Sequence, residues 1–538
     1  ARQGKNEITL GSKERPPLPR QGAPYLSTIL SNPLFHFSRN EWLFLIAVSG
    51  VLLLAINFNY VYGFLQTNEE YQFVGLLVNV YDQTTYLSHM EQAKNGSLLL
   101  SLLHSSEEVP PRIINFFFSL MGLFAVWFPK ILVYHVFRNL LALALIFLLY
   151  YFLGYFFRRV LHKPLVLLFL LFTSGWGVYT TLIPIPGGVS TTYLDFVVPE
   201  AHLFSSMYIF PHFLAALILN LLVYIFIFQY LGTERKIMIL FAALFAFILG
   251  FVHLYEIITI YAVLTPFLFF RWWKTKNLKK YVGNFLPFYG VTLVPMVYQL
   301  WMMLYYEESY GVLGKTILLT PPSSAIIMSF GIFSFFVAYF FVVFLKRAKS
   351  LQNVYERQLA DFSKQHQEIW MFLLFWILCN IVLLYFPLPP QRRFIQGLQI
   401  PIIILGSMTL FYLLIPSFVR WMRRWKESVD EGKVLLIVAG VIFVLHLASP
   451  IWILAADAYA LASYQSHVYQ DWNYYYILKE IYEGLQYIAY GDLQGTILSN
   501  SEAGNWIPSI NGNRVYQGHF SQTFERGKKQ KDWERFLT

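Results

Sequence analysis

Residues 131–156 read ILVYHVFRNLLALALIFLLYYFLGYF, an apolar run long enough to cross a lipid bilayer as one helix. A membrane-crossing helix needs about 20 mostly apolar residues. The chain has ten further apolar runs that are candidates for the same role, at residues 42–62, 164–183, 206–231, 236–253, 256–271, 282–305, 324–345, 369–387, 395–416 and 433–455. The sequence therefore predicts an all-α polytopic membrane protein with about eleven transmembrane helices.

The overall composition points the same way. Of the 538 residues, 57% are hydrophobic and only 13% are charged, and the mean hydropathy is +0.50. A soluble domain carries about 25% charged residues, so a water-soluble enzyme is excluded. The 51 Phe, 37 Tyr and 14 Trp residues exclude a disordered chain. A single cysteine, Cys379, excludes an internal disulfide and a cysteine-based metal cluster.

The distribution of positive charge predicts the orientation. With eleven spans and a cytoplasmic N-terminus, the N-terminal segment and five alternate loops place 26 of the 40 Lys and Arg residues inside. Counting the apolar run at 113–128 as a twelfth span would move one of these groups outside, so we predict an interfacial amphipathic helix there. The expected location is the plasma (inner) membrane of a bacterium, with the C-terminus extracytoplasmic. The basic excess then faces anionic membrane lipids, and no nucleic-acid partner is expected.

Three parts of the chain are expected. Residues 1–41 form a basic cytoplasmic segment without the apolar region of a cleavable signal peptide, and the missing initiator Met indicates a processed or fragmentary start. Residues 42–455 form the transmembrane domain, including an external loop at 63–130 with a helix from about residue 81 to Gly96. Residues 456–538 form a small extracytoplasmic α/β segment, left open as incomplete at Thr538. It begins with a helix at 474–490 and continues with a strand, a turn-rich stretch and a second strand.

Several loop motifs are similar to those of a known enzyme class. They are DQTTYLSHMEQAKNG from Asp82, PPRIINFFFSLMGLF from Pro110, VPEAHLFSSMYIFPHF from Val198, HLYE from His253, QRRF from Gln391 and TILSNSEAGNWIPSINGNRVYQGH from Thr496. With this layout the chain resembles the GT-C glycosyltransferases. Its nearest kin look like the protein O-mannosyltransferase and aminoarabinose-transferase branch and uncharacterised bacterial relatives. The resemblance implies inverting transfer of a sugar from a polyprenyl-phosphate carrier to a hydroxyl of a protein, lipid or glycan acceptor outside the cytoplasm.

The resemblance makes Asp82 the candidate general base, which would accept the proton of the attacking hydroxyl. The alternative is an exposed acid on an amphipathic loop helix. Gln83 and Tyr86, on the same segment, are candidates for orienting the sugar. Some enzymes of the class bind a divalent cation through paired carboxylates, but Gln83 replaces the second acid here. We therefore expect no metal ligands and no cofactor, with a divalent cation as the alternative.

Cations at the outer face are candidates for binding the phosphate. Arg392 and Arg393 form a basic pair in a short external loop, and a guanidinium matches phosphate geometry. The alternative is snorkelling toward lipid headgroups. Arg112 is a weaker candidate for the same task. Arg138 lies within a span, where a charge is costly and marks either a functional site or an ion pair between helices.

Three further residues are candidates for lining the cavity. Glu200, in the external approach to a span, could bind hydroxyl groups of the sugar or acceptor, or could simply be solvated. His253 and Tyr255 lie in an external turn beside Glu256 and could line the same cavity. A histidine at the end of a span is more often satisfied by backbone groups.

Two other functions compete with the transferase. One is an O-antigen ligase or polymerase, whose large external loop usually comes late in the chain rather than after the first span. The other is a polytopic transporter or flippase, for which internal repeats and charges deep in several spans are typical. This chain shows no clear half-to-half symmetry and places its external acids in loops, which favours a transferase.

Overall fold

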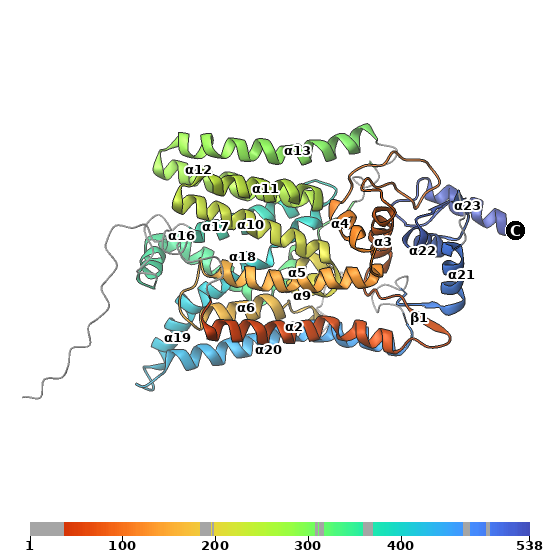
Figure 1. Cartoon of the computed structure of the whole chain (residues 1–538). Coiled ribbons are helices and arrows are strands. Elements are labelled where there is room, and N and C mark those ends of the chain that lie inside the picture. Colours follow the sequence, from red (N-terminus) through yellow and green to blue (C-terminus); the bar gives the residue numbers. More distant parts are fainter. Residues whose placement is uncertain are drawn as a thin grey trace, which may run out of the picture.

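The computed structural model describes residues 37–182, 195, 198–306, 310, 317–358, 369–465, 474–490 and 495–538, which are mostly helical. Most of the basic N-terminal segment, the basic residues Lys315 and Lys364, and the last residue of the predicted span at 164–183 lie outside this range. Figure 1 shows the long helices lying roughly side by side, with the C-terminal segment at one end of the bundle.

Seven helical runs in the described residues are long and apolar enough to cross a membrane. They are α2 (Arg39–Leu65), α5 (Lys130–Leu153), α10 (Pro211–Thr233), α12 (Leu254–Thr275), η2 with α13 (Lys279–Tyr305), the run from η3 to α19 (Gln391–Met422) and α20 (Glu431–Ala462). The first five of these and α20 each match one predicted span, and the run from η3 to α19 contains the span predicted at 395–416.

The four other predicted spans match shorter or bent helices. The helices α15 (Ser323–Phe330) and α16 (Ile332–Gln358) are bent by 104° at Gly331 and count as one span if taken together. The apolar helices α6 (His162–Phe172), α11 (Lys236–Val252) and α17 (Ile369–Leu384) have 17 residues or fewer. By length and composition the structure therefore gives seven or eight spans, and the total of eleven stays a prediction.

The span predicted at 164–183 is not one continuous helix. Helix α6 ends at Phe172, and a short helix, α7, begins at Gly177. Between them the chain runs against α15, where the Trp176 amide donates to the Met328 carbonyl oxygen at 2.8 Å. A Cβ atom at Gly175 would lie 2.3 Å from that oxygen, so only glycine allows the approach. Hydropathy alone cannot predict this close approach of two backbones, because it depends on a contact between distant segments.

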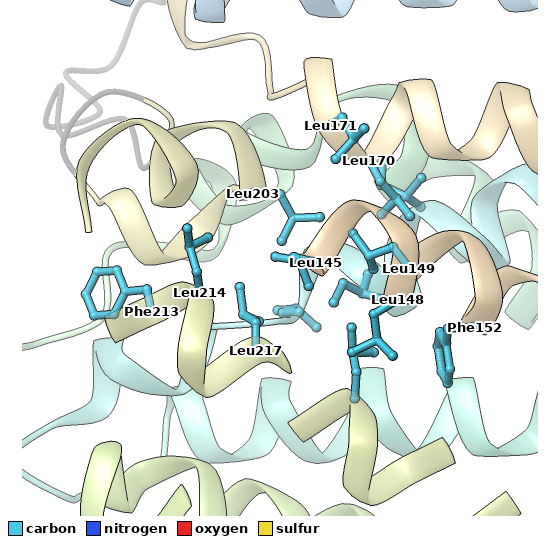
Figure 2. Close-up of a cluster of buried hydrophobic side chains, with 14 of the residues drawn as sticks. Leu145, Leu148, Leu149, Phe152, Leu170, Leu171, Leu203, Phe213, Leu214 and Leu217 are labelled. Carbon is cyan, nitrogen blue, oxygen red and sulfur yellow. The ribbon is translucent and has the colours of Figure 1, made fainter. Parts of the chain in front are cut away.

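The core of the bundle is packed by aliphatic side chains of consecutive helices. Figure 2 shows Leu145 and Leu149 of α5 facing Leu217 of α10, with Leu203 of α9 (Leu203–Ile209) beside them. All four side chains are buried. Because lipid tails are as apolar as leucine, this contact stabilises the bundle mainly through close packing.

The external loop and the C-terminal segment gather at one end of the bundle (Figure 1). The loop contributes α3 (Val80–Lys94) and α4 (Phe116–Phe124), and the C-terminal segment contributes α21 (Lys479–Tyr490), α22 (Ser501–Asn511) and α23 (Arg526–Leu537). Strand β1 (Tyr71–Phe73) pairs antiparallel with β2 (Tyr476–Leu478), and β3 (Thr496–Ile497) pairs parallel with β4 (Arg514–Val515). The two segments are thus joined by backbone as well as by side chains.

Some of the elements predicted for these two segments are confirmed, and others are wrong. The helix expected between residue 81 and Gly96 is confirmed as α3, and the run at 113–128 contains the nine-residue helix α4. The helix expected at 474–490 starts only at Lys479, because residues 476–478 pair with β1. The turn-rich stretch expected between the two later strands is wrong. It is helix α22, whose first turn is capped by the Asn500 side chain, which accepts from the Ala503 amide at 2.8 Å.

Candidate active site

Helix α3 begins at a strained turn. Val78 and Asn79 have φ values of 51° and 53°, in the left-handed region, immediately before the first helical residue. The buried Gln83 amide holds this turn by donating to the carbonyl oxygens of Leu77 at 2.7 Å and Val78 at 2.5 Å. Asp82 lies in the first turn of α3, where the helix dipole favours a negative charge. Gln83 therefore orients the segment that carries Asp82.

Asp82 is bonded to a histidine of the C-terminal segment. His519 Nε2 lies 3.1 Å from Asp82 Oδ1, and the His519 side chain is 3% exposed against 36% for Asp82. The Ser521 backbone N–H donates to His519 Nδ1 at 3.3 Å, and the Ser521 hydroxyl lies 3.0 Å from the same nitrogen. Because Nδ1 accepts these bonds, the ring proton resides on Nε2 and is donated to Asp82.

The basic pair lies in a short 3-10 helix, η3 (Gln391–Ile395), at the start of a membrane-spanning run. Arg393 Nη1 lies 3.1 Å from Oε1 of Glu200, a carboxylate that is 3% exposed in η1 (Pro199–Ala201). The Arg392 amide donates to the Leu318 carbonyl oxygen at 3.0 Å, which fixes the loop. Arg392 Nε has no hydrogen-bond partner among the described residues. One guanidinium is therefore held by a carboxylate, and the other has a donor left for a ligand.

These groups meet at one cavity of about 420 Å³. Of the residues predicted from the sequence, its walls contain Asp82, Tyr86, His253, Tyr255, Arg392 and Arg393. Residues that the sequence analysis did not single out also line it, among them His89, His212, His519, Ser521 and Gln522. The cavity thus joins side chains from α3, α10, the α11–α12 turn, η3 and the C-terminal segment.

The charge states of Asp82, His89 and Tyr86 follow from their burial and from neighbouring charged groups. Burial raises the pKa of Asp82, but the His519 hydrogen bond and the positive charges of Arg393 and Arg392 outweigh it, so the pKa lies below its ordinary value. Burial lowers the pKa of His89 to about 4. Burial and the charge of Asp82 raise the pKa of Tyr86 above its ordinary value. At neutral pH, Asp82 is therefore an anion, and the His89 imidazole and the Tyr86 phenol are neutral.

Four of the predicted residues do not line the cavity. Gln83 braces the turn before α3, and Glu200 acts on the cavity through Arg393. Arg112 lies 4.5 Å from the centroid of the Tyr306 ring and donates to the Tyr306 hydroxyl.

Arg138, the fourth, is completely buried between α2, α5 and α9. Its guanidinium donates to the carbonyl oxygens of Met207 at 2.9 Å, Tyr208 at 3.1 Å and Ile56 at 3.2 Å, and to Asn57 Oδ1 at 2.6 Å. These contacts favour a structural role.

The donor set at the cavity does not fit a divalent cation. Within the described residues, no group of three His, Cys, Asp or Glu side chains is arranged to hold a metal ion. Asp82 faces the N–H of His519 rather than a second carboxylate, and Gln83 turns its amide toward backbone carbonyls.

His519 is the cavity residue in contact with Asp82 that sequence reasoning missed. It lies within the quoted tail motif RVYQGH but carries no local pattern that distinguishes it from the other histidines. The pairing of the C-terminal segment with the external loop supplies the missing information. Thr523 Oγ1 donates to the His104 carbonyl oxygen at 2.8 Å, and the Val515 amide to that of Leu103 at 3.0 Å.

Comparison with known proteins gives structural neighbours only. No protein-family model matches the chain, and no curated protein matches it. The fold is similar to the crystal structure of the Archaeoglobus fulgidus oligosaccharyltransferase tethered to an acceptor peptide, with 10% identity, a TM-score of 0.41 and 88% of this chain covered. A second structure of that enzyme, in complex with zinc and sulfate, has 12% identity, a TM-score of 0.39 and 87% coverage. The chain spans 64% and 62% of the length of these neighbours.

Proposed function

We propose that this protein is an inverting glycosyltransferase of the GT-C superfamily. It would move a sugar from a polyprenyl-phosphate carrier to an acceptor hydroxyl on the extracytoplasmic face of the membrane. The observation that carries the proposal is the convergence of Asp82 with Arg392 and Arg393 on one cavity, although they are distant in the sequence. The cavity lies where the helix bundle meets the external segments, so a lipid-linked donor could reach it from the bilayer.

The proposed reaction uses Asp82 on one side of the cavity and Arg392 and Arg393 on the other. The acceptor oxygen attacks the anomeric carbon and forms the new C–O bond, while the bond from that carbon to the phosphate oxygen breaks. Its electron pair leaves with the polyprenyl phosphate. The proton of the acceptor hydroxyl passes to a carboxylate oxygen of Asp82, which is ionised at neutral pH. Attack opposite the leaving phosphate inverts the configuration of the anomeric carbon.

Arg392 and Arg393, which form the basic wall of the cavity, suit the leaving phosphate. As the bond to the sugar breaks, negative charge grows on the phosphate, and guanidinium donors already in place stabilise it. The Glu200 carboxylate neutralises part of the charge of Arg393, which leaves about one net positive charge on this wall. A phosphodiester carries one negative charge, so the balance favours a monophosphate carrier over a diphosphate.

The neutral side chains of the cavity suit the sugar. Tyr86, His89 and His253 offer donors and acceptors for hydroxyl groups, and Tyr86 is held by stacking on Phe118 with ring centroids 4.3 Å apart. Burial lowers the pKa of both His89 and His253, so they bind as uncharged groups. These contacts support an uncharged sugar as the transferred group.

The decisive experiment removes the base without changing its shape. Asp82→Asn should lower the rate of transfer by about a hundredfold to ten-thousandfold, because general-base catalysis contributes that much. The full chain, purified in detergent, is assayed for consumption of radiolabelled undecaprenyl-phosphate mannose, glucose and galactose in the presence of bacterial membrane extract as acceptor source.

Glu108→Gln is the matched control. It removes an exposed acid of the same external loop that lies outside the cavity lining, so turnover should be unchanged. Full activity of a folded Asp82→Asn protein would remove Asp82 from the mechanism. Failure of the wild-type protein to consume any of these donors, with directional transport of lipid-linked sugar across vesicles instead, would support the flippase alternative.

A further inference from the structure

The C-terminal segment supplies a buried side chain to the cavity. His519 follows β4 and precedes α23, and its ring is 3% exposed, yet it lines the same space as Asp82. The loop that carries it is anchored on both sides. The Gly518 amide donates to Thr523 Oγ1 at 2.9 Å, and that hydroxyl in turn donates to the His104 carbonyl oxygen. The imidazole is therefore fixed in the wall of the cavity.

The orientation of the ring is set by its own loop. Ser521 presents both its backbone N–H and its hydroxyl to Nδ1, at 3.3 Å and 3.0 Å. A backbone N–H cannot accept a hydrogen bond, so Nδ1 carries the lone pair and Nε2 the proton. Nε2 points at Asp82 Oδ1 across 3.1 Å. Only this tautomer satisfies both sides of the ring.

We propose that His519 is the positioning residue of the base. It donates from Nε2 to one oxygen of Asp82, so that the carboxylate keeps its position at the cavity and the second oxygen is left to receive the proton of the acceptor. The inference rests on the proposed function of Asp82. It adds that the site is built from two distant segments and is incomplete without the C-terminal one.

The surroundings of Asp82 determine the sign of the pH effect. Its carboxyl shares the cavity with titratable and charged groups of each neighbouring element, namely Tyr86 and His89 on α3, His212 on α10, His253 and Tyr255 at the α11–α12 turn, Arg392 and Arg393 on η3, and His519, with Glu200 behind Arg393. Burial raises the pKa of Asp82, and the bond from His519 is the first of the effects that lower it. Removing that donor raises the pKa, so the carboxylate is protonated, and inactive as a base, at a higher pH than in the wild type.

A matched pair of variants tests the position of the donor. The amide nitrogen of Gln reaches about as far as Nε2 of histidine, whereas that of Asn reaches only as far as Nδ1. His519→Gln should keep the bond and most of the activity. His519→Asn should lose about tenfold to a hundredfold in kcat, since a hydrogen bond to a charged group is removed. The acid limb of its pH–rate profile should move to higher pH.

His104→Gln is the control for damage to the fold. The His104 ring packs edge-on against His519, with centroids 5.9 Å apart, and contacts Gln522 and Asn505 rather than Asp82. The acid limb of the pH–rate profile of His104→Gln should stay at the wild-type position. Equal activity and equal acid limbs in His519→Asn and His519→Gln would overturn the proposal. Any polar side chain at residue 519 would then support activity, wherever its donor lies.

A second measurement needs no substrate. In protein labelled with nitrogen-15 histidine, the difference between wild-type and His519→Gln solid-state NMR spectra reports the tautomer of His519. A protonated Nε2 with a bare Nδ1 is expected at neutral pH, and the opposite tautomer would overturn the proposal even if transfer is never detected. A wild-type protein that consumes no donor, but has the expected tautomer, would count against the proposed function alone.

Discussion

Two arginine sites show how differently one side chain can be used. Arg138 lies among α2, α5 and α9 and donates to three carbonyl oxygens and an Asn side chain. Arg392 lies in the wall of a cavity, and its Nε has no partner among the described residues. A guanidinium whose donors are used by the fold is part of the framework, whereas one with a donor left over can bind a ligand. The hydrogen-bond inventory separates the two uses.

The largest effect should come from the framework arginine. Arg138→Ala removes the shared donor of the acceptors on α2 and α9. The Tyr208 carbonyl oxygen and Asn57 Oδ1 keep donors from Tyr60 and Asn139, but several hydrogen bonds from a charged group, worth about 1.5–3 kcal/mol each, are lost inside the bundle. We expect a loss of several kcal/mol in stability, seen as a marked fall in the unfolding temperature in detergent. Arg138→Lys restores the charge but not the fork of donors, so it should rescue little. A protein of wild-type stability after Arg138→Ala would show that these contacts do not hold the bundle together.

The cavity arginine should respond in the opposite way. Arg392→Ala should leave the unfolding temperature close to wild type, because Nε of its guanidinium makes no hydrogen bond within the described residues that the substitution would remove. The KM for the lipid-linked donor should rise about tenfold to a hundredfold, the usual loss for a hydrogen bond to a charged group. Titration of activity against donor concentration measures it. An unchanged KM together with a fall in stability would place Arg392 in the framework as well.

The smallest effect is expected where the C-terminal segment is held by a partly exposed ion pair. Lys529 Nζ lies 2.7 Å from Glu107 Oε2, and that carboxylate is 42% exposed. Lys529 itself is buried and also donates to the Ser105 hydroxyl at 2.8 Å. That hydroxyl keeps a partner in the Phe524 amide and Glu107 can be hydrated, so Lys529→Ala should lower the free energy of unfolding by about 1 kcal/mol and leave kcat unaltered. Thermal unfolding at low and high salt checks this. A large loss would mean that the pair, rather than the backbone pairing, joins the C-terminal segment to the loop.

Local patterns in the sequence predicted the elements well where one helix decides its own structure. The apolar runs around α2, α5, α10 and α20, and the helix that carries Asp82, follow from composition and periodicity. The break after Phe172 could not be predicted, because it depends on the approach of α15 to Gly175. Helix α22 was missed because Gly504 and Pro508 favour a turn locally, while its cap and its packing against α3 favour a helix.

The candidate site shows the same division. Asp82 was found because its segment resembles a motif of a known enzyme class, and Arg392 and Arg393 because they form a basic pair in a short loop next to a span. Each of these signals is carried by a single segment. The bracing role of Gln83 and the contact of His519 with Asp82 depend on contacts made only after folding. For Arg138, the sequence showed a costly buried charge but not its acceptors, so it could not separate a structural role from a role in the candidate site.

The pairing of β1 with β2 has a consequence for biogenesis. Tyr71–Phe73 leaves the ribosome early, but its partner Tyr476–Leu478 is made only after the last membrane helix, and His519 later still. Until residue 519 is made, the inserted protein would lack one wall of the candidate cavity. A chain cut short before that residue would then be inserted in the membrane without the proposed activity.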